Sequence, residues 1–245
     1  MSVVLYESRN HVAIITLNRP DKRNAINDET CNALRDAWRK FASGEDRVAV
    51  LTGAGNEAFS SGADLREPPK ALWQALPGIG MQLEKPVILA VSGWCVGGAI
   101  IIAMLADMIV ADETTRFLFP EAKLGMFGGV AAGLVSRMPH KIAMEFMLVG
   151  EEMSAARAYE LGFVNRVVPA GQSLEAAMEY ARKIAANAPL VVQAIKRVAL
   201  QTLPRAPSER FYPDLGRLQD IDASEDRAEG VRAFGEKRPP RFKGR

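Results

Sequence analysis

The sequence predicts an α/β protein, and two observations carry that prediction. As far as residue 172, short apolar runs alternate with segments whose apolar residues recur at helical spacing. From Ser173 onward strand-like runs all but disappear, and prolines punctuate helical segments. A chain of 245 residues that is 48% hydrophobic is long enough for one large core. We therefore expect a core over residues 1–185 and a helical region over residues 186–245.

The first elements follow from short patterns. Residues 3–8 and 11–17 alternate between apolar and polar side chains, which predicts a hairpin. A helix is expected after Asn27 or Asp28, either of which is a good N-cap. A strand over 48–52 and a helix that ends before Pro86 should follow. The first helix has an apolar face made of Cys31, Leu34, Ala37, Trp38 and Phe41.

The later elements alternate in the same way. The pattern predicts a strand over 87–91 and an apolar helix from Gly97 or Gly98. Strands are also expected near 108–111, 116–119 and 164–168. Helices are expected at about 130–137, 140–149 and 155–161.

One stretch invites a different interpretation. Residues 87–106 carry no charge, and 20 residues of helix would cross a bilayer core of roughly 30 Å. However, the run begins like a buried strand, breaks at Ser92 and Gly93, and restarts at Gly97 and Gly98. A buried strand, a turn and a helix explain both the apolarity and the glycines, so we expect no membrane span.

Charge and composition exclude several classes of function. The net charge is only +2, and the helix from Asn27 to Phe41 balances its basic and acidic side chains, so we expect no nucleic-acid partner. Only His11 and His140 are present, too few for a zinc site or a Ser-His-Asp triad. Two cysteines provide no disulfide framework, and the N-terminus lacks a signal-peptide pattern. We expect a cytoplasmic protein without a metal.

Two glycine-centred segments, residues 58–64 and 92–98, carry the functional prediction. Each is a place where backbone N–H groups can face a ligand, since glycine permits close approach and positive φ. Two such groups on one oxygen form an oxyanion hole, which stabilises charge that develops on a carbonyl. Ser60 and Ser61 have no base nearby in sequence and are interpreted as turn formers. Glu121 follows an apolar run that ends in Pro120 and is the candidate acid/base.

With these segments the chain resembles the enoyl-CoA hydratase/isomerase family, also called the crotonase family. The resemblance rests on five elements in order, and any one of them alone would be weak. Together they run from residue 17 to residue 238. They are residues 17–20 with Asn24 and Ala25; residues 58–64; residues 90–98 with Ala103 and Asp107; Pro120 with Glu121; and residues 224–238 with Ser224, Asp226, Glu229, Gly230, Phe234, Glu236, Lys237 and Arg238.

The resemblance implies a spiral of stacked β-β-α units followed by C-terminal helices, assembled as a homotrimer or a dimer of trimers. It implies an acyl-CoA thioester as substrate, a place in fatty acid metabolism, and no cofactor beyond the CoA of that substrate. By position, the N–H groups of Ala63 and Gly98 would form the oxyanion hole and Glu121 would be the acid/base. The implied CoA-binding residues are Arg23, Ala25, Ala63, Asp64, Leu65, Arg66, Gly98, Phe234 and Lys237.

The chain departs from the family pattern at one important position. Hydratases of the family use two glutamates, and Ile101 stands where the first would be, three residues beyond Gly98. Glu121 alone could still move a proton, so enoyl-CoA hydratase and double-bond isomerase both stay open. Decarboxylation, thioester hydrolysis, C–C cleavage and non-catalytic binding of acyl-CoA are the alternatives.

Three smaller expectations follow from the residues around this site. Ile101 should make the site drier and raise the pKa of Glu121. The apolar segment 125–133 is expected to shape the acyl pocket. The basic side chains of Arg241, Lys243 and Arg245 are expected to lie on a solvated tail.

Overall fold

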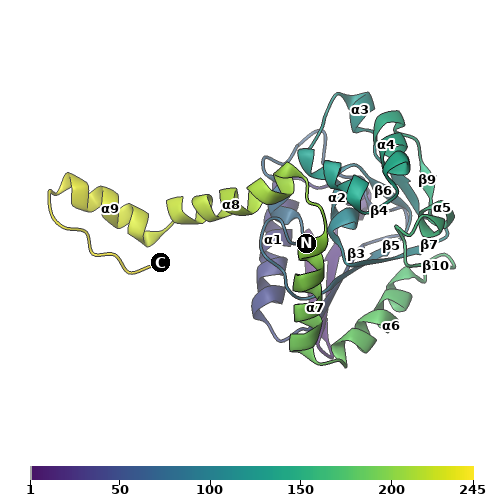
Figure 1. Cartoon of the computed structure of the whole chain (residues 1–245), viewed down its shortest axis with the longest axis horizontal. Helices are drawn as coiled ribbons and strands as arrows, with labels where there is room; N and C mark the ends of the chain where they lie inside the picture. The colour runs from purple at the N-terminus through teal and green to yellow at the C-terminus, as the bar shows by residue number, and fades with distance from the viewer. Residues whose placement is uncertain (1) are drawn as a thin grey trace.

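Two β-sheets form the body of the protein in the computed structural model, which describes residues 2–245 (Figure 1). The larger sheet contains, in spatial order, β1 (Val4–Arg9), β2 (Val12–Leu17), β3 (Val48–Gly53), β5 (Val87–Val91), β7 (Met108–Asp112) and β10 (Arg166–Val168). The smaller sheet contains β4 (Ala58–Ser60), β6 (Trp94–Val96), β8 (Arg116–Leu118) and β9 (Met153–Ser154). The pairs β1–β2 and β8–β9 are antiparallel, and the others are parallel.

Successive strands alternate between the two sheets. The chain passes from β3 to β4, from β5 to β6 and from β7 to β8, each time from the larger sheet to the smaller one. The second of these pairs is followed by α2 (Gly98–Leu105) and the third by α3 (Glu121–Leu124). This repeated course is the expected spiral of β-β-α units. Because the strands of each sheet are mostly parallel, corresponding loops of successive units meet at one edge.

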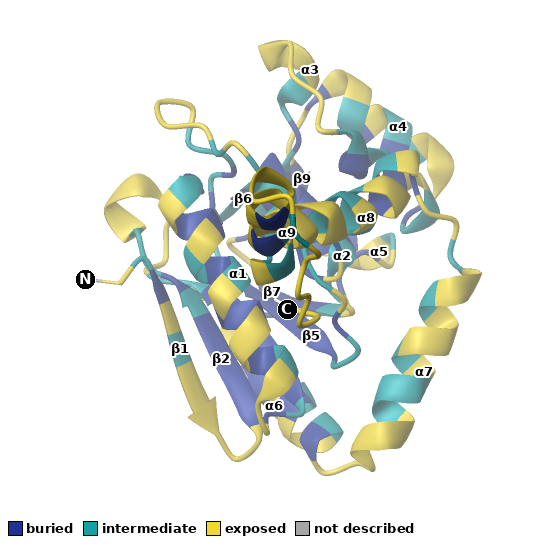
Figure 2. Cartoon of the chain, turned by 90° about the vertical axis from the view of Figure 1, so that its left-hand side faces the viewer, coloured by how far each residue is buried: buried dark blue, intermediate teal, exposed yellow. Residues whose placement is uncertain are grey.

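Helices cover the sheets with the faces that their periodicity predicts. The α1 helix (Asp28–Ser43) buries all five residues of the expected apolar face, and its N-cap is Asn27, whose side chain accepts from Thr30 N. In α2 every residue from Gly98 to Met104 is buried. The α6 helix (Ser173–Ala185) packs small side chains against the larger sheet. Figure 2 shows β2 buried along most of its length, and buried residues of α1 alternating with exposed ones as expected for a helix with one buried face.

The remaining short elements lie around these layers. They are the 3-10 helices η1 (Pro20–Lys22), η2 (Leu72–Ala75) and η3 (Gly129–Ser136), and the helices α4 (His140–Val149) and α5 (Ala155–Glu160). No helix within residues 2–245 is both long and apolar enough to cross a bilayer. The uncharged stretch 87–106 instead divides into β5, β6 and α2.

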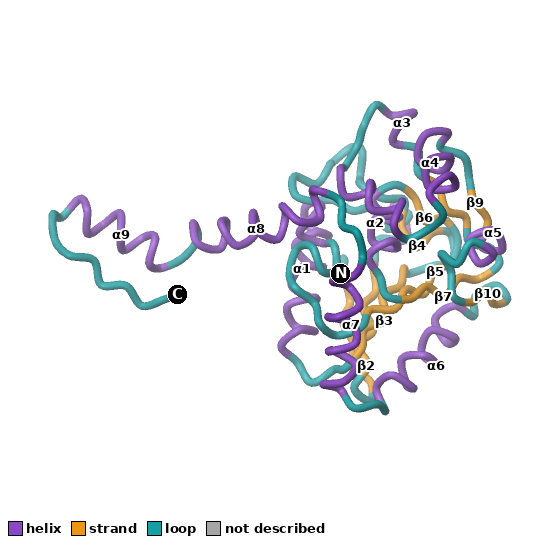
Figure 3. Tube along the Cα trace, in the orientation of Figure 1, coloured by secondary structure: helices purple, strands orange, loops and turns teal. Residues whose placement is uncertain are grey.

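Of the C-terminal helices, one lies on the body and two extend away from it (Figure 1). The α7 helix (Pro189–Thr202) lies on the body without a fully buried residue, and Lys196 Nζ is 2.7 Å from Asp107 Oδ2. The arm, which we define as residues 207–245, holds α8 (Pro207–Asp222), α9 (Glu225–Gly235) and the final residues, and it extends away from the sheets (Figures 1 and 3).

The basic tail is more ordered than expected. Its side chains are exposed, but its backbone folds back on α9. Arg241 N donates to Glu229 Oε1 at 3.0 Å, and Gly244 N donates to Asp226 Oδ2 at 2.8 Å. The carboxylates of Glu229 and Asp226 in α9 therefore accept hydrogen bonds from the backbone of the tail. The positive charges of the tail did not predict these backbone interactions.

Three expectations about secondary structure were wrong or incomplete. Residues 66–85 do not form a helix, because Pro68, Pro69, Pro77, Gly78 and Gly80 leave room only for the short η2. The segment 129–136 is a 3-10 helix rather than an α-helix. The strands β4, β6 and β9 were not expected, since two or three residues are too short to show a period.

We predict that the stability of the fold depends on the buried face of α1. Leu34→Ala removes a side chain that is fully buried, so the free energy of unfolding should fall by about 2–5 kcal/mol. The control Leu148→Ala, at a side chain that is 65% exposed on α4, should change it by less than about 0.5 kcal/mol. Urea unfolding at one fixed protein concentration measures both. Equal effects of the two substitutions would contradict the packing described for α1.

Candidate active site

The backbone N–H groups of Ala63, which follows β4, and of Gly98, which begins α2, lie close to each other. Ile26 N donates to Gly62 O and Asp64 N donates to Ile26 O, each at 2.8 Å, as in a parallel bridge. This pairing turns the N–H of Ala63 away from Ile26. Gly98 is the first residue of α2, so its N–H has no acceptor within the helix. Neither amide has an acceptor anywhere in residues 2–245.

The two amides are neighbours, and glycines allow them to be. A Cβ atom added to Gly98 would lie 3.5 Å from Ala63 N, and one added to Gly62 would lie 2.9 Å from Gly98 N. Gly62 and Gly97 also have φ of +82° and +56°, which side chains other than glycine rarely adopt. An oxygen atom placed between Ala63 and Gly98 would accept from both N–H groups, and the N-terminus of α2 would favour negative charge there.

Glu121 stands beside these amides. Gly97 N donates to Leu118 O at 2.9 Å, which joins the start of α2 to the end of β8. Phe119 is buried, Pro120 is the N-cap of α3, and Glu121 begins that helix. A Cβ added to Gly97 would lie 2.9 Å from Glu121 Oε1. The carboxylate therefore faces the backbone that precedes the second amide.

The Glu121 carboxyl is poorly solvated. Its Oε2 atom is buried and has no hydrogen-bond partner among the described residues. Burial raises the pKa of Glu121 from its ordinary value of 4.5 to about 7, as the sequence led us to expect. At neutral pH such a group is present in both protonated and ionised forms, which suits a group that gives and takes a proton.

Aliphatic side chains complete the surroundings. Ile101 is 5% exposed in the first turn of α2, and a Cβ added to Gly128 would lie 3.9 Å from its Cδ1 atom. Gly128 belongs to the loop that follows α3, so Ile101 faces the segment that comes after Glu121. Leu72 of η2 lies over Gly98, where an added Cβ would be 2.9 Å from Leu72 Cδ2. Neither side chain can orient water or carry a proton.

Comparison with known proteins identifies the family of the chain. The family model described as enoyl-CoA hydratase/isomerase matches residues 7–245. The chain belongs to the enoyl-CoA hydratase/isomerase family. It is 38% identical to an enoyl-CoA hydratase of Mycobacterium tuberculosis, over 98% of this chain and 96% of that protein. It is 37% identical to an (E)-benzylidenesuccinyl-CoA hydratase of Thauera aromatica, over 98% of this chain and 99% of that protein.

Solved structures of the family share the fold over the whole chain. A carnitinyl-CoA hydratase from Mycobacterium avium superposes with a TM-score of 0.79 at 36% identity, with both chains fully covered. An enoyl-CoA hydratase from Mycobacterium tuberculosis gives a TM-score of 0.76 at 35% identity, again over both whole chains. The expected family and fold are therefore confirmed.

The structure places most of the expected CoA-binding residues near Ala63. Asp64 has its pKa lowered by backbone N–H groups of Arg66 and Glu67 and by Arg19, against the effect of burial, so it holds the local turn together. Arg23 has a positive φ of 50° and pairs with Glu57 at 2.7 Å. Three other expected CoA-binding residues of this region differ in exposure. Ala25 is buried, whereas Leu65 is 62% exposed and Arg66 is exposed.

Two expected CoA-binding residues lie elsewhere in the chain. Phe234, at 88% exposure, and Lys237 are on or just after α9, at the far end of the arm. Figure 1 shows α9 well separated from α2 and α3. Within one chain these two residues are not brought to Ala63, Gly98 and Glu121.

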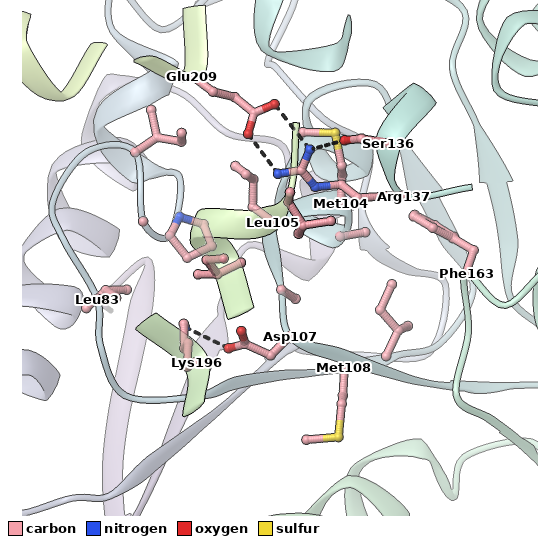
Figure 4. A pocket seen from close by; sticks show the side chains of 18 of the residues that line it. Leu83, Met104, Leu105, Asp107, Met108, Ser136, Arg137, Phe163, Lys196 and Glu209 are labelled. Carbon is pink, nitrogen blue, oxygen red and sulfur yellow. Dashed lines mark hydrogen bonds and ion pairs between the residues drawn. The ribbon is translucent and has the colours of Figure 1, made fainter. Parts of the chain in front are cut away.

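A separate cavity lies on another side of the body. It has a volume of about 330 Å³ between the end of α2 and α7, and none of Ala63, Gly98 and Glu121 lines it (Figure 4). Four of its five charged side chains form two ion pairs: Asp107 pairs with Lys196 at 2.7 Å, and Arg137 pairs with Glu209 at 2.7 Å. The candidate site at Ala63, Gly98 and Glu121 is therefore distinct from that cavity.

Sequence reasoning missed Leu72 and recognised the role of Ser60. No pattern marks Leu72, because its segment was expected to be helical and its contact with Gly98 depends on the course of the loop. Ser60 Oγ donates to Asn24 O and accepts from Gly62 N, so it shapes the turn before Ala63 as expected. The turn is thus fixed by a side chain and not only by its glycine.

The raised pKa of Glu121 predicts a pH-dependent cost to stability. Between about pH 4.5 and pH 7 the folded protein keeps a proton that the unfolded chain releases, so stability falls as pH rises through this window. Glu121→Gln should therefore raise the free energy of unfolding at pH 8 by about 1–2 kcal/mol, a value reduced to allow for partial solvation. The gain should shrink towards zero at pH 4.5.

Urea unfolding of wild type and variant at the two pH values measures this difference. Glu145→Gln, at an exposed glutamate of α4, is the matched control and should show no such gain. If Glu121→Gln were no more stable than wild type at pH 8, the carboxyl would not be desolvated as described.

Proposed function

We propose that the protein catalyses the reversible hydration of a 2-enoyl-CoA thioester. The observation that carries this proposal is the Glu121 carboxyl, with a buried and unpartnered Oε2, beside two amides without acceptors. The names of relatives support it, since they include hydratases and a carnitinyl-CoA dehydratase of Salmonella typhi that is 38% identical with both chains fully covered. The proposed acyl group has a C2=C3 double bond conjugated with the thioester.

The proposed mechanism uses one carboxylate twice. The thioester oxygen accepts from Ala63 N and Gly98 N. Ionised Glu121 takes a proton from water as the water oxygen bonds to C3, and the electron pair of the double bond moves to form the enolate. Glu121 then returns that proton to C2, which gives a 3-hydroxyacyl thioester. A pKa near 7 suits both proton transfers, because neither form of the carboxyl is strongly favoured.

The other proposed roles follow from position. Arg23, Ala25, Asp64, Leu65 and Arg66 would line the path of the CoA moiety beside the first amide. The reaction transfers only a proton and water, so the proposal includes no cofactor beyond the CoA of the substrate. We also propose a cytoplasmic location and a role in fatty acid metabolism, because both cysteines are buried and unpaired and the relatives act on CoA esters by name.

Double-bond isomerisation is the second candidate, and Ile101 is the observation that favours it. Removal of a proton from C4 and its return to C2 needs one mobile acid/base and no water. An aliphatic residue at position 101 lowers the water content of the site and leaves Glu121 as the acid/base for both steps. Decarboxylation, hydrolysis and C–C cleavage have no specific observation in their favour here.

Substitution of Glu121 tests both candidates. Glu121→Gln keeps the shape of the side chain and removes its acid/base function, so turnover of an enoyl-CoA should fall by about 10²–10⁴-fold. The measurement is mass spectrometry of short 2-enoyl-CoA and 3-enoyl-CoA thioesters incubated in deuterated water. Glu113→Gln, at an exposed position after β7, is the control and should leave turnover unchanged.

The products separate the two reactions. A hydroxyacyl product that contains the elements of water supports hydration, whereas a shifted double bond with deuterium at C2 or C4 and no added water supports isomerisation. Equal behaviour of wild type and Glu121→Gln across the panel would refute the assignment of Glu121.

We further propose that residues 186–245 serve assembly, as a homotrimer or a dimer of trimers. The arm exposes apolar side chains that its own body does not cover, including Leu218, Ile221, Val231 and Phe234, each at least 57% exposed. Exposed apolar surface of this kind marks a protein interface. In such an assembly Phe234 and Lys237 would reach the CoA bound to a neighbouring copy.

This assembly predicts the mass of the protein in solution. Sedimentation equilibrium should give three or six times the chain mass of 26.7 kDa. Ile221→Asp places a charge on the proposed interface, so it should weaken assembly by about tenfold or more in the association constant. Lys141→Asp, at an exposed charged position of α4, is the control and should leave the mass unchanged. A monomeric wild type would refute the proposal.

A further inference from the structure

The short helix η2 connects three parts of the molecule through four successive residues. Leu72 lies over Gly98, as described above. Trp73 stacks on Tyr212 of α8, with ring centroids 5.4 Å apart and planes within 7° of parallel. Gln74 Oε1 accepts from Arg35 of α1 at 2.7 Å, and Ala75 O accepts from Trp38 Nε1 at 2.8 Å. One turn of chain therefore touches the candidate site, α1 and α8.

This turn has little structure of its own to hold it. A 3-10 helix of four residues has poor hydrogen-bond geometry, and the N-cap residue of η2 offers no side-chain bond. Prolines and glycines precede and follow it at Pro69, Pro77 and Gly78. The position of Leu72 consequently depends on the partners that its neighbours find on other elements.

Trp73, which stacks on Tyr212, directly follows Leu72 in the chain. A Cβ added to Gly216 would lie 3.4 Å from the Trp73 ring, so α8 receives this indole against a glycine one turn beyond Tyr212. Gln74 Nε2 also donates to Gln219 of α8 at 2.9 Å. Three residues of one face of α8 thus hold the two residues that follow Leu72. Offset aromatic pairs of this kind contribute about 0.5–1.5 kcal/mol beyond the area that they bury.

We propose that Trp73 is a positioning residue for the oxyanion hole: its stack on Tyr212 holds Leu72 over Gly98 and keeps water from the thioester oxygen. The proposal rests on the oxyanion role of Ala63 and Gly98 within the proposed function. Exclusion of water strengthens the hydrogen bonds from these two amides to a developing negative charge. Because Tyr212 belongs to α8, the geometry of the arm then affects the chemistry of the site.

The test uses acetoacetyl-CoA, a probe that reports on the oxyanion hole without itself undergoing the hydration reaction. Acetoacetyl-CoA loses a C2 proton to Glu121 or to water, and the negative charge of the resulting enolate is shared by its two carbonyl oxygens. The enolate absorbs in the near ultraviolet, so a difference spectrum gives the enolate fraction of the bound probe. That fraction measures how strongly the two amides stabilise the anion, whichever reaction the enzyme catalyses.

Tyr212→Ala should lower the bound enolate fraction at least threefold and kcat about tenfold. KM should change less than threefold, because the substitution weakens stabilisation of the enolate anion more than binding of the CoA moiety. Tyr212→Phe keeps the ring and should stay within about twofold of wild type in each quantity. Leu72→Ala should reproduce the loss, and it supplies the result if Tyr212→Ala fails to fold. The double variant with Tyr212→Ala and Leu72→Ala should lose no more enolate fraction or kcat than Leu72→Ala alone. Both substitutions are proposed to act through the contact of Leu72 with Gly98.

Other outcomes overturn the proposal. Wild-type enolate fraction in Tyr212→Ala with wild-type assembly would show that the stack has only a structural role. Losses that multiply in the double variant would show that Leu72 and Tyr212 act separately. A wild type that binds acetoacetyl-CoA without forming the enolate would refute the oxyanion role and this proposal together. A wild type that forms the enolate but hydrates no enoyl-CoA would refute the hydration proposal alone.

Discussion

Two N–H groups without acceptors among the described residues are the constraint on which the rest of the structure depends. A donor that lacks an acceptor and is shielded from water costs about 1–3 kcal/mol, so a fold that shields two of them side by side needs other contacts that compensate. Here the compensation is local. The bridge of Ile26 to the segment 62–64 fixes one amide, and the bond from Gly97 N to Leu118 O fixes the start of the helix that carries the other. An oxygen atom of a ligand removes the cost by accepting from both.

The same apolar surroundings act on Glu121. Ile101 and Leu72 enclose the space next to the amides, and burial holds the pKa of Glu121 near 7. A carboxyl in water would ionise completely at neutral pH and would protonate C2 poorly. The chain therefore gives up some stability above pH 7 in exchange for a carboxyl that can transfer a proton in either direction, a common trade between stability and activity.

Much of this arrangement could be predicted from the sequence because its determinants are local. Glycine adopts positive φ more readily than other residues, so Gly62 and Gly97 mark the positions just before the two amides. The face of α1 follows from its period, and all five expected residues are buried. The expected pairing of Ala63 and Gly98 came from resemblance, but the reason for it lies in a bridge between Ile26 and Ala63, whose partners are 37 residues apart.

What the sequence could not show are contacts that depend on the path of irregular segments. The segment 66–85 has apolar residues at helical spacing, but its prolines and glycines override that period. The contact of Leu72 with Gly98 and the stack of Trp73 on Tyr212 join residues that are 26 and 139 positions apart, and no pattern of letters marks either pair. The docking of the tail on Glu229 is equally invisible, since a run of positive charges is usually solvated.

The helix α8 ties the walls of the site to the arm. Beyond the Trp73 stack, its first turn contributes Glu209, which pairs with Arg137 at the end of η3, and a Cβ added to Gly129 would lie 3.2 Å from Ser208 Oγ. The Arg137 and Glu209 side chains are 14% and 2% exposed, so their separation would leave charge without a partner in a poorly solvated place. Contacts with η3 and η2 therefore run along α8 from Ser208 to Gln219, while Leu218 and Ile221 of the same helix expose apolar side chains to water. A partner that covers these apolar side chains would restrain the whole helix, and through it the two segments that face Gly98 and Ile101.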